Sequence, residues 1–343
     1  MTSEKKDGDV VLSSLEETSG LFRMSVQNQF DTRNIVLTEK GMLDQQISLS
    51  KARRTELSFA RSSYDDVCAF FQEASKDYDS DLVNPYWAFT HEILKFILMK
   101  FITEHFHDAR TIRMFDAGAG TGNWSRFVLN LGIGMRGIMF DMNANMLKIA
   151  KPKLAQVDNS VYIIEGNLEI PSDFPHQRSN LMLCMHNVIG LARNTEVVLR
   201  NLCDYLEDDG LAFIMAMNKY HAFNFIRQFR DEAEILRVVQ DETVKFKNDM
   251  PEMFCYTPEK LERILLGAGF NEVTVLGFPV TVYPSMQDTK LLRKDASIFQ
   301  LKNPKARSEL LALEKRLCLY PELAYRGGSS LIAVCKKNVT VLD

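Results

Sequence analysis

The sequence predicts an α/β fold built on a mostly parallel sheet, and two observations support this. From Thr111 onward, short apolar runs alternate with helical stretches, which is the pattern of parallel strands joined by crossover helices. The first of these runs leads into FDAGAGTGNW, Phe115 to Trp124, a glycine-rich turn of the kind that joins a strand to a helix. The composition, 46% hydrophobic and 25% charged residues over 343 positions, is that of an ordinary globular chain with a sizeable core.

The chain ahead of the glycine-rich turn divides into two predicted segments. Residues 1–55 form a polar, weakly patterned N-terminal arm, and the sequence leaves open whether it is partly disordered or folds over a second subunit. Residues 56–109 form a predicted helical cap of two amphipathic helices, YDDVCAFFQEASKDY and YWAFTHEILKFILMKFITEHF, separated by the turn-like SDLVNP. Residues 110–343 form the third predicted segment, a domain that begins at the glycine-rich turn's strand.

Five successive strands are predicted, each followed by a helix: TIRMFDA, MRGIMFD, SVYIIEG, NLMLCMH and GLAFIMAMN. After Asn218 a helical insertion is expected over residues 219–256, helical to about Lys247. TPEKLERILLGAGF then reads as a helix, with Thr257 as N-cap, Pro258 at its first position, and Gly267 and Gly269 closing it. The strands NEVTVLGFPV and SSLIAVCKK flank a second helical insertion, residues 285–325.

The net charge and the cysteines indicate which partners and which cellular compartment to expect. A formal net charge of −4 and a pI near 6.0 provide no basic field, which disfavours nucleic acid as a partner. The six cysteines show no C-x-x-C pairing, and two lie in apolar runs, so reduced thiols in a cytoplasmic protein are expected. Neither a signal peptide nor a membrane span is predicted, and a homo-oligomer is left open.

The glycine-rich turn fits some nucleotides better than others. Its spacing is G-x-G-x-G with Asn123 where a dinucleotide-binding turn needs a third glycine, and it lacks the G-K-[ST] ending of a P-loop. A carboxylate at the strand tip, Asp116, would repel a pyrophosphate but can accept from the ammonium of a zwitterionic ligand. Asp141 ends the second strand, where a carboxylate accepts from ribose hydroxyls, and the amide of Asn167 follows the third.

In this order and spacing, the motifs resemble those of the class I S-adenosylmethionine-dependent methyltransferases. DAGAGTG resembles their first motif, Asp141 in MFDMN their ribose acid, and EGN their adenine motif, over about residues 110–280 plus the last strand. The resemblance implies a Rossmann-like, seven-stranded sheet with an antiparallel last strand, and S-adenosylmethionine as cofactor. It implies these cofactor-binding residues: Asp116, Gly118, Ala119, Gly120, Thr121, Gly122, Asp141, Met142, Asn167, Leu168 and His186.

Two positions depart from that family's pattern. Asn167 stands where the adenine motif usually has an acid, and Asn180 where the fourth strand usually begins with an aspartate. An amide can also bond an adenine edge, so neither change removes the expected cofactor site.

Polar residues at the ends of the fourth and fifth strands are the candidates for chemistry and substrate binding. His186 is the candidate general base, with a histidine that bonds the backbone or the cofactor as the alternative. No metal site is predicted. Candidate substrate-binding residues are the aromatic residues ahead of the glycine-rich turn and the polar ones at the strand ends: Tyr78, Tyr86, Trp87, Asn187, Asn218 and Tyr220.

The leading functional hypothesis is methyl transfer from S-adenosylmethionine to a small-molecule acceptor, such as a secondary metabolite, by in-line displacement. One alternative is C-methylation of an isoprenoid diphosphate, where aromatic faces would stabilise a carbocation. Another is methylation of a modified tRNA nucleotide, because CMHNVIG and MNKYHA resemble the subgroup that contains the bacterial tRNA carboxymethoxyuridine methyltransferase. A non-catalytic cofactor-binding subunit is a third alternative. The sequence does not identify the acceptor or the atom that is methylated.

Overall fold

The computed structural model describes residues 63–79, 84–107, 111–131, 135–157, 161–229, 232–246, 250–282, 301–328 and 330–337. The chain divides into two units, Met1–Ala60 and Arg61–Asp343, and every described residue belongs to the second. The predicted N-terminal arm, residues 1–55, therefore lies outside the described residues, as do 56–62 of the predicted cap and 285–300 of the second insertion.

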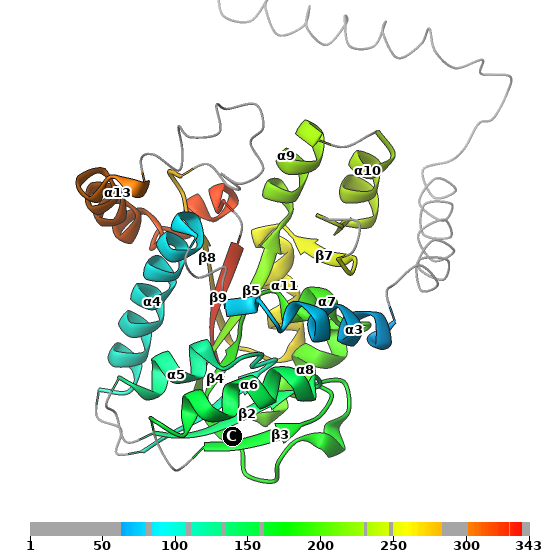
Figure 1. Ribbon diagram of the computed structural model, residues 1–343, viewed down its shortest axis with the longest axis vertical. Helices are drawn as coiled ribbons and strands as arrows, with labels where there is room; N and C mark the ends of the chain where they lie inside the picture. Colours follow the sequence, from blue (N-terminus) through cyan, green and yellow to red (C-terminus); the bar gives the residue numbers. More distant parts are fainter. Residues whose placement is uncertain are drawn as a thin grey trace, which may run out of the picture. The chain divides into compact units, whose positions relative to one another are not determined.

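The core of the fold is a twisted sheet in which all seven predicted strands are present (Figure 1). Strands β1 to β5 run parallel in the order β3-β2-β1-β4-β5. The last strand, β9, pairs antiparallel with β5 on one side and with β8 on the other, which confirms the predicted antiparallel last strand. The seven strands are β1 (Ile112–Ala117), β2 (Met135–Asp141), β3 (Val161–Glu165), β4 (Ser179–Cys184), β5 (Leu206–Asn218), β8 (Glu272–Phe278) and β9 (Ser330–Lys337).

Two short strands, β6 (Thr243–Val244) and β7 (Met253–Tyr256), were not predicted. They pair antiparallel, and β7 also extends the sheet beside the end of β5. The helical stretch expected to about Lys247 instead comprises α9 (Lys219–Phe229), α10 (Glu232–Leu236) and a π-helical turn (Arg237–Asp241). Glu242 ends it with a left-handed backbone, φ 59°, and the β-branched pair Thr243-Val244 then favours a strand.

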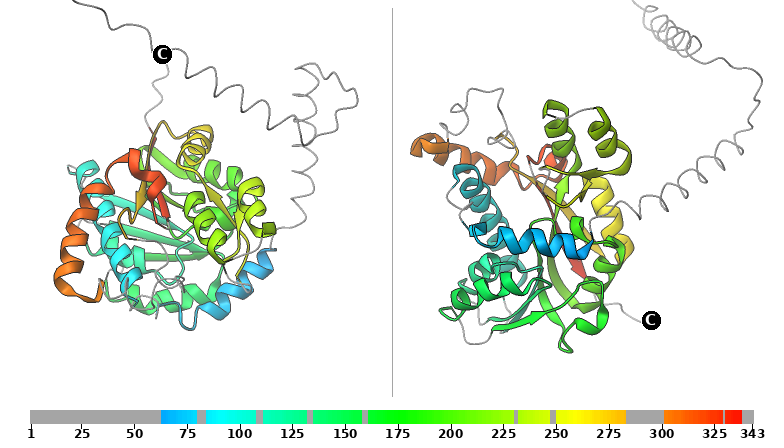
Figure 2. Two further views of the ribbon diagram at one scale, coloured as in Figure 1. Left: turned by 90° about the horizontal axis from the view of Figure 1, so that it is seen from above. Right: turned by 45° about the vertical axis from the view of Figure 1, so that its right-hand side comes forward.

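Helices cover both faces of the sheet, which gives three layers (Figures 1 and 2). One face packs against α4 (Pro85–His105), α5 (Asn123–Leu129), α6 (Ala144–Leu154) and α13 (Pro304–Leu317). The opposite face packs against α7 (Val188–Leu191), α8 (Thr195–Tyr205) and α11 (Pro258–Ala268). A further helix, α3 (Tyr64–Ala74), precedes α4.

The helix ends follow the predicted capping chemistry. The side chain of Thr257 accepts from Lys260 N, Pro258 occupies the first position of α11, and Gly269 closes the helix in the left-handed region, φ 111°. Gly267 lies inside α11, so only one of the two glycines ends it. Asn84 caps α4 in the same way as Thr257 caps α11, with Pro85 next. Both predicted cap helices are thus present, as α3 and α4.

A buried carboxylate joins the second insertion to the sheet. Glu314 of α13 is fully buried and accepts from Val280 N (2.8 Å), Thr281 N (2.5 Å) and Thr281 Oγ1 (2.5 Å). These donors follow β8, so the contact fixes α13 against the end of that strand. Among the described helices, none combines the length and the apolar composition that crossing a bilayer requires.

Candidate functional site

The glycine-rich turn follows β1 and adopts a backbone that needs its glycines. Gly118 and Gly120 have positive φ values of 71° and 54°. The backbone N–H groups of Gly118 and Ala119 both donate to Phe140 O at the end of β2, at 2.8 and 3.1 Å. A Cβ atom on Gly118 would lie 2.4 Å from Cγ2 of Val188, whereas one on Gly120 would meet nothing within 4 Å. Gly120 therefore borders open space in which a ligand can lie against the backbone.

Gly122 has a different role from the one predicted. It is not among the residues that line the pocket described below. A Cβ atom there would lie 2.9 Å from Cε of Met139 and 3.1 Å from Cβ of Ala150. Its glycine is needed for the close packing of the turn against β2 and α6, and its contact with the cofactor stays a prediction.

Two carboxylates stand at the ends of β1 and β2. Asp116 is buried and accepts a 2.6 Å hydrogen bond from Ser125 Oγ. Burial raises its pKa to about 7, although the bonds from Ser125 act in the opposite direction. Asp141 accepts from Gly120 N and Asn143 N, each at 2.8 Å, and burial raises its pKa as well. Asp141 thus holds the glycine turn in place while it faces the pocket.

A single pocket of about 1050 Å³, including the open space at its mouth, brings most of the predicted residues together. It lies at the carboxyl ends of β1 to β4, where ligands bind in open parallel sheets. The predicted residues that line it are Tyr78, Asp116, Gly118, Ala119, Gly120, Thr121, Asp141, Met142, Asn167, Leu168 and His186.

The turn after β3 presents an amide to this pocket. Asn167 accepts from Glu169 N through Oδ1 (2.9 Å), and its own backbone N donates to Asp173 (2.9 Å). No described residue accepts from its Nδ2. The departure from the family's acid therefore leaves a fixed amide whose N–H groups can reach a ligand.

The turn after β4 points His186 into the pocket. His186 and Asn187 both have left-handed backbones, with φ values of 53° and 62°, a strained pair for residues with side chains. Trp124 Nε1 donates to His186 Nε2 at 2.6 Å. Since an indole N–H can only donate, His186 Nε2 must accept, and the proton of the neutral ring is on Nδ1.

The electrostatic surroundings keep His186 neutral. The His186 side chain is exposed at the pocket, whereas protein surrounds its other sides; burial on those sides, and then His91, lowers its pKa below the usual value. His91 of α4 lies 5.0 Å from the Trp124 ring and 5.5 Å from that of His186, centroid to centroid. Burial and then Lys95 lower the pKa of His91 to about 4. Both imidazoles are therefore neutral at pH 7.

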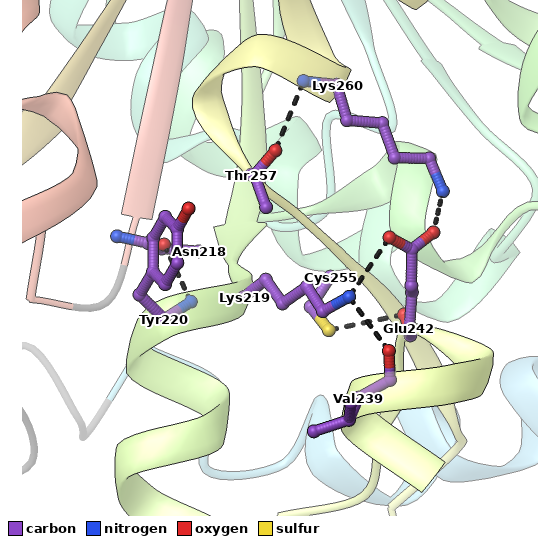
Figure 3. A network of polar contacts seen from close by, with 8 residues as sticks. All are labelled: Asn218, Lys219, Tyr220, Val239, Glu242, Cys255, Thr257 and Lys260. Carbon is purple, nitrogen blue, oxygen red and sulfur yellow. Dashed lines mark hydrogen bonds and ion pairs between the residues drawn. The ribbon is translucent and has the colours of Figure 1, made fainter. Parts of the chain in front are cut away.

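Of three polar residues predicted to bind substrate, two instead support the backbone and the third is exposed. Asn187 Oδ1 accepts from Met217 N (2.9 Å) and so joins the end of β4 to β5. Asn218 is fully buried, and its Nδ2 donates to Tyr325 O and Gly327 O. Figure 3 shows that its Oδ1 accepts from Tyr220 N at the start of α9. Tyr220 is exposed. None of the three lines the pocket, so the structure does not bring them to the cofactor site, and their contact with a substrate stays a prediction.

Two predicted aromatic residues also lie elsewhere. Tyr86 is buried in the core between α4 and the sheet, and Trp87 packs against the same core. Neither lines the pocket. Core packing, the ordinary fate of aromatic residues at helical spacing, accounts for both.

The structure adds pocket residues that were not predicted. Tyr64, Val67 and Phe71 of α3 line the pocket, as do Asn123 and Trp124 directly after the glycine turn. The i, i+3, i+7 spacing of the first three places them on one face of α3, which is a signal visible in the sequence. The others are Met146, Gly166, Met185, Val188, Leu191, Ala192 and Val198.

Among the described residues that line the pocket, the charged ones are acidic. The described lining residues include two carboxylates, Asp116 and Asp141, and no Lys or Arg. Across the part of the chain that the structure describes, no group of three or more His, Cys, Asp or Glu side chains is arranged to hold a metal ion.

Comparison with known proteins agrees with this geometry. The model of a methyltransferase domain family matches residues 86–275, more than half of the chain. No curated protein sequence matches.

Several solved structures are similar at low identity. The plantazolicin methyltransferase BamL is 14% identical, with a TM-score of 0.45, over 81% of this chain and 100% of its own. An S-adenosylmethionine-dependent methyltransferase from Clostridium acetobutylicum is 11% identical, with a TM-score of 0.46, over 73% and 92%. Haemonchus contortus phosphoethanolamine N-methyltransferase 2 is 15% identical, with a TM-score of 0.45, over 77% and 60%. The family model carries the assignment: the chain belongs to the methyltransferase domain family and is an S-adenosylmethionine-dependent methyltransferase.

Proposed function

We propose that this enzyme methylates a small-molecule acceptor, such as a secondary metabolite, that is neutral or cationic. The supporting observation is the pocket wall, which is mainly apolar and aromatic and, among the described residues, has no Lys or Arg. A phosphate-rich acceptor would need cations near the reacting end of the pocket. A neutral or cationic acceptor needs none.

The residues at the pocket fit the cofactor group by group. Gly120 leaves open space against the backbone, where any larger side chain would intrude. Asp116, buried beside Ser125, provides the negative charge that a methionine ammonium requires. Asp141 can accept from ribose hydroxyls, and Asn167 and Leu168 can meet the adenine. When bound, S-adenosylmethionine supplies an activated methyl group on a positively charged sulfur.

We assign His186 a positioning role rather than the role of general base. Its Nε2 lone pair already accepts from Trp124, so it cannot also take a proton from an acceptor unless that bond breaks. The remaining ring nitrogen, Nδ1, carries a proton and can donate to an acceptor or to the cofactor. Trp124 and His186 would thus orient the acceptor and exclude water, which is most of what an in-line displacement needs.

The two alternative acceptors have less support. Two described cations close to the pocket are already engaged: Lys153 pairs with Asp79, and the Arg193 guanidinium lies 4.5 Å from the centre of the Tyr64 ring. A diphosphate or a tRNA would have to displace these contacts. The aromatic cluster of His91, Trp124 and His186 could face a carbocation. The described residues that line the pocket, however, include no Lys or Arg that could bind the diphosphate.

A methyl-transfer assay with separated acceptor pools tests the proposal. The enzyme is incubated with S-adenosylmethionine labelled at its methyl group and with three pools: an organic extract of small metabolites, total tRNA, and isoprenoid diphosphates. We expect label in the metabolite pool only, and none with Gly120→Arg. Label in tRNA or in a diphosphate would contradict the proposed acceptor class while leaving methyl transfer intact.

A further inference from the structure

A segment ahead of the sheet forms one wall of the cofactor pocket. We call residues 63–79, which comprise α3 and the turn after it, the strap. The strap contributes Tyr64, Val67, Phe71 and Tyr78 to the pocket lining. Of the α3 residues, only Val67 is buried. The strap is therefore joined to the domain less by core packing than by the polar contacts described next.

Its carboxyl end is fixed to the glycine turn by one carboxylate. Asp79 Oδ1 accepts from Thr121 Oγ1 (2.9 Å) and from Asn123 Nδ2 (2.8 Å). Its Oδ2 pairs with Lys153 Nζ of α6 at 2.5 Å. Although burial acts to raise it, the pKa of Asp79 is lowered by the bonds from Lys153, Asn123 and Thr121. Asp79 is therefore ionised at neutral pH.

Lys153 closes this cluster from the other side. Its Nζ also donates to Thr121 O (2.9 Å) and to Asn123 Oδ1 (3.0 Å). Thr121 and Asn123 therefore lie between an anion on the strap and a cation on α6, and both line the pocket. Any outward movement of the strap at Asp79 breaks contacts to two pocket residues at once.

The rest of the strap is held at two more points. The Tyr64 hydroxyl bonds Glu169, and the Arg193 guanidinium lies over the Tyr64 ring at 4.5 Å. In the middle, Asn143 Nδ2 donates to Cys68 O at 3.1 Å. The strap thus contacts the loops that follow β1, β2 and β3, and each of these loops provides cofactor-pocket residues.

We propose that the strap is a releasable wall of the cofactor site and that Asp79 is its positioning residue. Asp79 acts through Thr121 and Asn123, which it holds in the conformation that lines the pocket. With Asp79 bound to Lys153, the apolar face of α3 covers the cofactor. When these contacts break, the product S-adenosylhomocysteine can leave. The Asp79 cluster therefore sets the dissociation rate of the product.

Stopped-flow fluorescence tests this with S-adenosylhomocysteine as the probe, because Trp124 lines the pocket and reports its occupancy. Asp79→Asn keeps the shape of the side chain and removes its charge. We expect it to raise the dissociation rate about tenfold, with a smaller change in the association rate. Lys153→Met should also raise the dissociation rate. In the double variant the fold increase should be smaller than the product of the two single increases, because Asp79 and Lys153 belong to one cluster.

Matched variants separate this role from a general loss of structure. Lys148→Met removes an exposed lysine from the same helix, and its dissociation rate should equal that of the wild type. The melting temperature of cofactor-free Asp79→Asn should stay close to that of the wild type. If Asp79→Asn does not fold, Tyr64→Phe at the other end should still raise the dissociation rate, by about threefold. An unchanged rate in the folded strap variants, or an equal effect of Lys148→Met, would overturn the proposal.

Discussion

Trp124 donates a 2.6 Å hydrogen bond from its indole Nε1 to Nε2 of His186. Trp124 belongs to α5, directly after the glycine turn, and His186 follows β4, so this bond joins two neighbouring strand ends at the pocket. It also fixes which nitrogen of His186 is protonated, because the indole can only donate. The sequence offers His186 as a base, whereas we propose from this bond that it is a neutral donor.

The protonation of His186 can be tested directly. Long-range ¹H–¹⁵N spectra at pH 7 should show the proton on Nδ1 and a bare Nε2. In Trp124→Phe the preference for this tautomer should weaken about fivefold, the value of one hydrogen bond of about 1 kcal/mol. His105, whose Nε2 contacts Asp209 O, is an internal control and should not change. A proton on Nε2 of His186 in the wild type would contradict the assigned role.

Cofactor affinity should depend on pH through Asp116. Its carboxyl must be ionised to pair with the ligand's ammonium, and burial raises its pKa to about 7. The affinity for S-adenosylhomocysteine should therefore fall about tenfold per unit as the pH drops below 7, with one proton released on binding at pH 6. Calorimetry in buffers of different ionisation enthalpy measures both. An affinity that stays constant from pH 5.5 to 7.5 is incompatible with this role.

The raised pKa of Asp116 also affects the stability of the cofactor-free protein. The folded-state pKa of Asp116, about 7, lies above the ordinary value of 3.8 for an aspartate carboxyl. The folded state therefore favours the protonated form of Asp116. This preference adds to the free energy of unfolding below about pH 4, and the added stability is lost as the pH rises to 7. Asp116→Asn should remove this pH-dependent loss from urea denaturation curves and should also weaken cofactor binding.

Glu314 should contribute to stability without contributing to binding. Its carboxylate accepts from three donors after β8, and Glu314→Ala removes all three hydrogen bonds together with the buried side chain that makes them. We expect a loss of about 3 kcal/mol in the free energy of unfolding. Affinity for S-adenosylhomocysteine should change less than twofold, since Glu314 is not a pocket residue. Glu309→Ala, at an exposed position of the same helix, is the control and should have little effect on stability.

The sequence predicts the cofactor side of the site well because its signals are local. The glycine spacing from Gly118 to Gly122, and the acids that end β1 and β2, lie on consecutive elements whose order sets their positions. Even here Gly122 serves packing against Met139, which depends on a contact between separate elements. The fold is predicted for the same reason, except for β6 and β7, which are too short to produce a pattern.

The acceptor side is predicted poorly because a polar residue at a strand end can serve the backbone as readily as a ligand. Asn187 and Asn218 both bond main-chain groups on other segments, and no periodicity reveals those partners. Asp79, by contrast, is a candidate functional residue that no sequence pattern reveals. It lies in a turn without any motif, and only the fold places it beside Thr121 and Lys153.

The central claim is that the pocket bordered by Gly120 binds the cofactor. Titration calorimetry with S-adenosylhomocysteine tests it most directly, on the wild type and on Gly120→Arg. The variant should fold, because no neighbour lies within 4 Å of a Cβ atom there and the cost of its positive φ is about 1–2 kcal/mol. We predict one binding site per wild-type chain and no binding by the folded variant. A folded wild type that binds no S-adenosylhomocysteine, or a variant that binds as tightly as the wild type, would contradict the account.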